Sequence, residues 1–248
     1  LIGWNAGPVR FLNKEIALEK IKEALRVTRR LGFIGTALTN YKELGEIIDF
    51  TLKAGGRISF SSLRLTPLNR QFLEALRKSG QKMVTLAPEA GSERLRFLLG
   101  KHIKDSEIEE ILQLVKETGL PQVKLYFMYG LPSEGEEDLK AIPLLLLGFR
   151  KKIPGLKFII SLSAFVPKPW TPLQWHPMER MDVVKQRLKQ VKKALLPLKG
   201  VKVFHDVPKY AYMQGFFSMG DRRVSKLLEA MLRMHDWKKA CIETGIDP

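Results

Sequence analysis

The chain has 248 residues, 45% of them hydrophobic, which is enough to bury a core as one large α/β domain or two small ones. Its longest apolar stretch, IPLLLLGF at 142–149, is too short to span a bilayer, and a single cysteine, Cys241, excludes an intrachain disulfide framework. We therefore expect a globular protein of the reducing cytoplasm that does not enter a membrane. Because the chain begins LIGWNAG, without Met, we also expect a fragment whose upstream part was cleaved, deleted or left out.

The net charge of +16 is unevenly spread, since residues 1–149 carry +4 and residues 150–248 carry +12. An excess of this size attracts anionic partners, among them nucleic acid, acidic proteins and phosphorylated metabolites. The same charge is also consistent with a solvated surface, because several lysines recur at the spacing of an exposed helix face. These lysines are Lys185, Lys189, Lys192 and Lys193.

Helices and strands are predicted to alternate along the chain. A first helix begins at the N-cap Asn13 and ends at Gly32, where a glycine can stop it. The later predicted helices cover 41–56, 66–80, 105–121 and 134–150. The predicted strands cover 33–38, 57–65, 82–88, 122–130 and 156–165.

This alternation is typical of βα units with parallel strands, which right-handed crossovers curl into a barrel or a doubly wound sheet. The strands show little polar alternation, as expected for strands covered on both faces. After about residue 178 the pattern changes to a helix at 181–198, a short strand at 201–207 and short helical pieces. The sequence thus predicts a barrel domain over 1–178 and an extension packed on it over 179–248.

Function is expected at the carboxyl ends of the strands in either architecture. In LYFMYGLPSEGEEDL, Gly130 lets a ligand approach the backbone, while Glu136 and Glu137 complement the positive end of the next helix. Ordinary loop structure explains this motif as well. In SSLRLTP, Ser61 and Arg64 could hold a carboxylate, or Arg64 could form a surface salt bridge.

Two further segments follow strands. APEAGSERLR places several polar side chains where they could hold a ligand, or where they could form a helix cap around Ser92: Glu89, Ser92, Arg94 and Arg96. FVPKPWTPLQW, at 165–175, is stiff and aromatic, and a proline-rich loop packed on the extension would explain it.

His205 and Asp206 end the short strand and could form an acid/base pair or a structural hydrogen bond. No Walker A loop, Ser-His-Asp order or zinc-ligand spacing is found, so no metal site is predicted in this chain.

Taken in this order, the motifs resemble those of the radical S-adenosylmethionine (radical SAM) enzymes, most closely the poorly characterised cobalamin-associated group. The resemblance extends over nearly the whole chain. It is carried by IGTALTNYKEL, SLR, APEAGSERLR, YFMYGLPSEGEEDL and SAFVPKPWTPLQW, and by a tail with His205-Asp206 and GDRRV at 220–224.

The resemblance implies an α/β fold, a partial (β/α)6 TIM-type barrel with strands two to six present, followed by a C-terminal α/β extension. It implies S-adenosylmethionine (SAM) as cofactor, with Gly130 near the adenine and Phe165 opening a lid over it. Gly35 and Thr36 would support the methionine part of SAM. The remaining residues carried over to the SAM site are Ser61, Arg64, Glu89, Ser92 and Lys124.

The family's Cx3Cx2C loop, whose thiolates hold a [4Fe–4S] cluster, is absent here. The chain opens with GWNAGPVR, similar to the segment that follows that loop, so we expect truncation just downstream of it and an inactive fragment. A cobalamin-binding domain is expected upstream.

Two alternatives stay open. One is an RNA-binding module or RNA-modifying enzyme that uses the basic C-terminal half and its interleaved aromatic residues. The other is a relative that naturally lacks the cluster and serves as a scaffold.

Overall fold

The structure, a computed structural model, describes residues 7–35, 38–60, 63, 65 and 68–246. These residues form six strands: β1 (Arg30–Phe33), β2 (Arg57–Phe60), β3 (Met83–Glu89), β4 (Gln122–Tyr129), β5 (Lys157–Ala164) and β6 (Val201–His205). The helices of the first half are α2 (Lys14–Val27), the short 3₁₀ helix η1 (Leu38–Asn40), α3 (Leu44–Lys53), α4 (Arg70–Lys78), α5 (Glu93–Leu98) and α6 (Asp105–Glu117). Those of the second half are α7 (Glu136–Lys152), α8 (Met181–Leu195), α9 (Pro208–Met219), α10 (Val224–Met234) and α11 (Trp237–Thr244).

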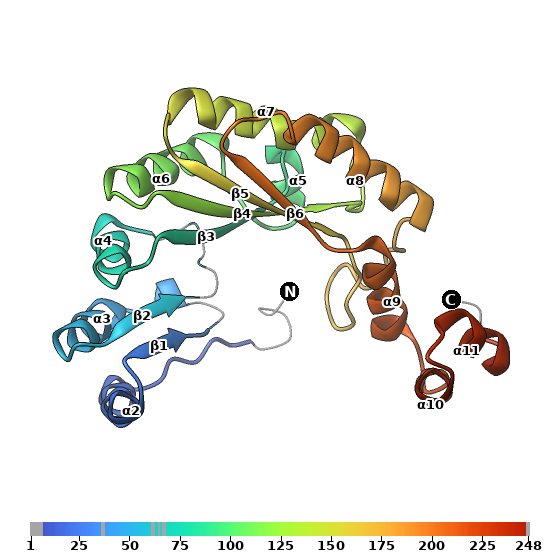
Figure 1. Cartoon of the computed structure of the whole chain (residues 1–248), viewed down its shortest axis with the longest axis horizontal. Coiled ribbons are helices and arrows are strands. Elements are labelled where there is room, and N and C mark those ends of the chain that lie inside the picture. Colours follow the sequence, from blue (N-terminus) through green and yellow to red (C-terminus); the bar gives the residue numbers. More distant parts are fainter. Residues whose placement is uncertain (1–6, 36–37, 61–62, 64, 66–67, 247–248) are drawn as a thin grey trace.

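All pairings between the named strands are parallel. β3, β4, β5 and β6 form one sheet in that order, and β1 pairs with β2 in a second. An isolated parallel bridge between Leu63 and Leu86 joins the segment after β2 to β3. The strands therefore follow chain order along a curved wall whose outer side is covered by helices (Figure 1). This is the mixed α/β partial barrel that the sequence predicts.

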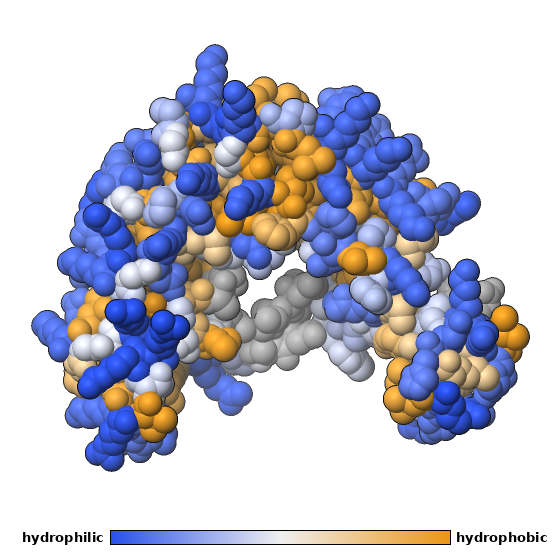
Figure 2. All heavy atoms as spheres, in the orientation of Figure 1, coloured by the Kyte–Doolittle hydropathy of each residue, from blue (hydrophilic) through white to orange (hydrophobic). Residues whose placement is uncertain are grey.

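The core lies between the sheet and its outer helices. In β4, Val123, Leu125, Phe127 and Tyr129 are at most 1% exposed and pack in this core, whereas the side chains between them are half-buried. The expectation of strands covered on both faces is therefore wrong for this strand. Among the described residues no second layer covers the face opposite the helices, and Figure 2 shows the molecule hollowed on that side.

The first helix and strand differ from their predicted bounds. α2 begins after Asn13, whose side chain caps it as expected, but it ends at Val27, and Thr28 is already extended. β1 follows at once, because Arg30–Phe33 pair with β2. Gly32 consequently lies inside a strand instead of ending a helix.

β6 belongs to the main sheet. It pairs in register with β5, from Phe158–Val201 to Leu162–His205. The short strand predicted within the extension thus continues the wall of the barrel, while the division of the chain at residue 178 stays a prediction.

The last helices form a small unit beside the sheet. α10 and α11 pack around their own core of Leu227, Ala230, Ala240 and Cys241 and lie at the end of the molecule opposite α2 and α3 (Figure 1). Across the described residues, no helix combines the length and apolar character that crossing a bilayer requires.

Candidate functional site

The carboxyl ends of β3, β4 and β5 lie side by side because these strands are parallel and paired. Glu89, the last residue of β3, has a φ of 73°, a left-handed conformation that non-glycine residues seldom adopt. The pairing register with β4 shifts between Leu86 and Glu89. A bulge of this kind re-aims a side chain at the end of a strand.

Lys101 holds the Glu89 side chain. Its Nζ lies 2.7 Å from Glu89 Oε1 and donates a second hydrogen bond, of 2.8 Å, to the carbonyl of Ala87. Both side chains stay partly exposed, so the Glu89 carboxylate has an oxygen available to a ligand.

Arg96 fixes the loop that follows β3. Its side chain is fully buried, donates to the carbonyls of Ala90, Gly91 and Ile103, and forms an ion pair with Asp105. A buried guanidinium with four such partners serves the loop's structure and leaves it no role in binding a ligand.

The loop after β4 turns back on itself at Gly130, whose φ of 72° favours glycine. The Gly130 N–H donates to Glu134 Oε2 at 2.7 Å, so the carboxylate closes the turn from inside. Glu134 is 2% exposed, and this burial raises the pKa of its carboxyl to about 7, although the Gly130 N–H and the charge of Arg187 act in the opposite direction.

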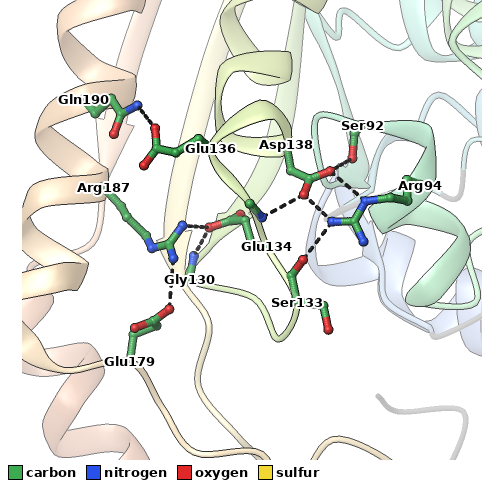
Figure 3. A network of polar contacts seen from close by, with 11 residues as sticks. Ser92, Arg94, Gly130, Ser133, Glu134, Glu136, Asp138, Glu179, Arg187 and Gln190 are labelled. Atoms are coloured by element: carbon green, nitrogen blue, oxygen red, sulfur yellow. Dashed lines mark hydrogen bonds and ion pairs between the residues drawn. The ribbon is translucent and has the colours of Figure 1, made fainter.

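Arg187 of α8 connects this turn to the later part of the chain. Its guanidinium pairs with Glu134 at 3.2 Å and with Glu179 at 3.0 Å (Figure 3). Its Nε is buried without a hydrogen-bond partner among the described residues. One arginine therefore fixes α8 against the turn at the end of β4.

Asp138 fastens the same loop on its other side. It accepts hydrogen bonds from Ser92 Oγ at 2.5 Å and the Gly135 N–H at 2.8 Å, and it forms an ion pair with Arg94. Burial alone would raise the pKa of Asp138, but the hydrogen bonds from Arg94, Ser92 and Gly135 outweigh it and keep the pKa below its usual value. Arg94 also donates to the Ser133 carbonyl at 2.7 Å.

The loop from Gly130 to Asp138 is thus held from two flanks, by Arg94 near the end of β3 and by Arg187 of α8 (Figure 3). Ser92 caps α5 by accepting from the Leu95 N–H, as one of the two interpretations of APEAGSERLR predicts. Its hydroxyl is therefore occupied within the protein.

The segment after β5 is ordered by local hydrogen bonds. Phe165 is buried beside Leu131, and its N–H donates to the Tyr129 carbonyl at 2.8 Å. Trp170 has a φ of 61°, and its N–H donates to Gln174 Oε1 at 3.0 Å. Trp170 and Trp175 are 80% and 84% exposed, so in this structure neither indole covers the strand ends.

Other predicted site residues lie elsewhere. Lys124 is in the first half of β4, five residues before the strand ends, and its Nζ lies 4.6 Å from the ring centroid of Tyr126. Gly35 is exposed beyond the end of β1. Thr36, Ser61 and Arg64 fall outside the described residues.

At the end of β6, the His205 ring does not contact the Asp206 side chain among the hydrogen bonds of the described residues. His205 Nε2 lies 2.9 Å from Lys192 Nζ of α8, and its Nδ1 lies 3.0 Å from the Asp206 backbone oxygen. Both ring nitrogens therefore contact groups other than the Asp206 carboxylate. That carboxylate adds to the effect of burial on Tyr129, whose pKa is raised to about 12.

Three residues of the loop network escaped sequence reasoning: Glu134, Asp138 and Arg187. Asp138 had a signal, because an acidic residue three positions after Gly135 is the pattern of a helix cap. Glu134 lies within the motif LYFMYGLPSEGEEDL, but no local pattern indicates its contact with Arg187, since 53 positions separate the two residues.

The described residues do not fit an iron–sulfur cluster. They contain no group of three His, Cys, Asp or Glu side chains that could hold a metal ion, and Cys241 is buried in α11. A [4Fe–4S] cluster needs thiolates that this part of the chain does not supply.

Residues 3–146, more than half of the chain, match the family described as the Radical SAM superfamily. A curated relative, the uncharacterized protein MJ0966 of Methanocaldococcus jannaschii, is 33% identical over 225 residues, covering 90% of this chain and 49% of the relative. The chain therefore spans about half the length of the curated relative it matches.

Solved structures have a similar fold. Streptococcus suis SuiB bound to S-adenosylmethionine has a TM-score of 0.58 at 11% identity, covering 84% of this chain and 48% of SuiB. Coproporphyrinogen III oxidase (HemN) of Escherichia coli, a radical SAM enzyme, has a TM-score of 0.54 at 15% identity, covering 74% and 45%. At such identities the likeness shows the fold alone, and it agrees with a partial barrel. With the family match over residues 3–146, it follows that the chain belongs to the radical SAM superfamily.

Proposed function

We propose that this chain holds SAM at the carboxyl ends of its parallel strands, and that the whole protein cleaves SAM reductively to start radical chemistry on a substrate. The observation that carries the proposal is the Glu89 carboxylate, which stands at the end of β3 in a left-handed conformation and is held by Lys101. Such a conformation costs about 1–3 kcal/mol and is retained chiefly at functional sites.

The groups around Glu89 suit the chemistry of SAM. A carboxylate accepts hydrogen bonds from ribose hydroxyls or an ammonium group. Half-buried Met128 and Leu173 pack against the apolar cluster that contains Phe165 and offer contacts to a planar base. Gly130 adopts a left-handed φ of 72° that turns the chain at the end of β4, with the Glu179 side chain beside it.

SAM beside a [4Fe–4S] cluster supplies one-electron, hydrogen-abstracting chemistry. The residues of this chain would bind SAM and orient it. Glu89 would contact the cofactor, Lys101 would aim that carboxylate, and Arg94 and Arg187 would keep the loop after β4 in one position. We assign Ser92 a positioning role through Asp138, because its hydroxyl is already engaged.

We also propose that the 248 residues alone do not cleave SAM, since a single cysteine cannot hold the cluster. A cobalamin-binding domain upstream, and with it methyl transfer in place of oxidation, stays a prediction from the family resemblance. No contact among the described residues favours it.

The first test uses the full-length protein after anaerobic iron–sulfur reconstitution. Formation of 5′-deoxyadenosine from SAM under dithionite is expected, together with its loss in the 248-residue chain. A full-length protein that carries no cluster and leaves SAM intact would refute the enzymatic proposal and favour a scaffold role.

The second test addresses the site. Glu89→Gln should weaken equilibrium binding of SAM at least tenfold, because the amide loses both the charge and the ion pair to Lys101. Glu110→Gln makes the same chemical change on the exposed surface of α6 and should leave binding unchanged. Equal affinities of the two variants would remove Glu89 from the site.

A further inference from the structure

The face of the sheet opposite the helices carries a regular arrangement of side chains. Residues paired in register across parallel strands lie on the same face, and alternate residues of one strand share a face. One row of this face contains Lys124, Ile159 and Lys202, and the next contains Tyr126, Ser161 and Phe204. We call these six residues the inner wall.

Within the part of the chain that the structure describes, no acidic side chain pairs with the lysines of the inner wall. Among the described residues, Lys124 and Lys202 form no ion pair, and Lys124 instead lies over the Tyr126 ring. At the carboxyl edge of the sheet, one oxygen of Glu89 pairs with Lys101.

More cations stand on the same face where other strands begin. Arg30 of β1 and Arg57 of β2 are register partners, and both are exposed, while Ile58 next to them is buried on the helix side. Lys157 begins β5 and is exposed as well. Cations therefore stand on this face in β1, β2, β4, β5 and β6, while β3 between them contributes none.

A barrel interior is ordinarily filled by branched apolar side chains in layers. Here two lysines, a serine and two partly exposed rings occupy such positions beside one branched side chain, Ile159. A wall with unpaired charge suits a bound anion better than it suits a packed core.

The rings add a second kind of contact. Phe204 is 57% exposed, and Tyr126 is half-buried on the same row. Neighbouring strands are about 4.8 Å apart, so the two lysines, and likewise the two rings, stand about 10 Å apart. Alternate residues of a strand are about 6.6 Å apart, which separates the lysine row from the ring row.

Cations beside aromatic rings, with phosphates on the cations and bases stacked on the rings, are the means by which proteins bind single-stranded nucleic acid, and Phe204 is the exposed ring of this wall. We propose that the inner wall binds a single-stranded nucleic acid as the substrate of this protein. The inference rests on the proposed function, since it names the substrate class of the same barrel.

The test measures binding of a fluorescein-labelled oligouridylate of about 12 nucleotides to the full-length protein by anisotropy over a series of salt concentrations. Replacing both wall lysines, Lys124→Gln with Lys202→Gln, should reduce the slope of log K against log salt by about 1.4, or about 0.7 for each phosphate contact. Phe204→Leu should weaken binding fivefold or more without changing that slope.

The matched control is Lys185→Gln with Lys189→Gln, which removes the same charge from the exposed face of α8. If the wall pair and the control pair lower the affinity for the oligonucleotide equally, the inference is overturned, because binding would then depend only on the overall charge of the protein. Uridine monophosphate that binds as tightly as the oligonucleotide, or polyglutamate that displaces it as effectively, would overturn it too.

Failure of this inference is distinguishable from failure of the proposed function. The unmodified protein is assayed in parallel for SAM binding and for 5′-deoxyadenosine without any oligonucleotide. If the protein cleaves SAM but the wall substitutions leave oligonucleotide binding unchanged, only the proposed substrate class is refuted. An intact SAM pool refutes the proposed function, whatever the oligonucleotide does.

Discussion

Replacing Glu134 by glutamine should flatten the pH dependence of stability. The Glu134 carboxyl is nearly fully buried, and its pKa rises from 4.5 to about 7 on folding. A raised pKa means that the folded state binds the proton more tightly than the unfolded state, so the stabilisation is complete below pH 4.5 and is lost as the pH rises through 7. One pKa unit corresponds to about 1.4 kcal/mol, which makes the loss about 2.5 kcal/mol between pH 5 and pH 8.

The assay is urea denaturation of the wild type and of Glu134→Gln at several pH values in that range. Titration of all other groups cancels in the difference between the two proteins. The wild type should lose about 2.5 kcal/mol relative to the variant on going from pH 5 to pH 8. Parallel stability profiles would refute the reasoning, because Glu134 would then ionise in the folded protein as easily as in the unfolded one.

Three other substitutions test the loops around the site. Asp138→Asn should lower the free energy of unfolding at pH 7 by about 2 kcal/mol, and this loss should shrink as the pH falls below 3.8. The control Asp182→Asn, in an exposed ion pair, should change it by less than about 0.5 kcal/mol. Equal effects of the two substitutions in urea denaturation would contradict this. Arg96→Met should cost about 3 kcal/mol and speed hydrogen exchange in the loop after β3, because it leaves three carbonyls unpaired; unchanged exchange would argue against that role. Gly91→Ala should lower the melting temperature, because the added Cβ would stand 2.5 Å from a backbone nitrogen of α7. Gly148→Ala, with open space around the added Cβ, should raise the melting temperature slightly. Shifts of the same sign in the two variants would contradict the packing of Gly91 against α7.

The later elements were predictable because their signals are local. The strand predicted at 122–130 is β4, Gln122–Tyr129, since an apolar run that stops at a glycine leaves few alternatives. The start of the chain was harder. Thr28 continues the helical spacing in the sequence, but Arg30–Phe33 gain a strand partner in β2, and that long-range pairing decides the bounds.

The site was predictable only in part, for the same reason. Glu89 and Gly130 could be placed together because parallel strands bring their carboxyl ends to one edge. The contact between Glu134 and Arg187 depends on how α8 packs, which no local pattern encodes. Lys124 was assigned to the SAM site by resemblance, and only the register of β4 with β5 places it on the inner wall.

The alternation along β4 separates two kinds of evolutionary constraint. Val123 and its companions on the helix side pack in the core, where only swaps of similar volume are tolerated. Lys124 and Tyr126 on the other side lie outside that core, so we expect substitutions at these two positions to cost less stability. Related proteins can therefore vary at these positions of the wall while the barrel itself stays folded.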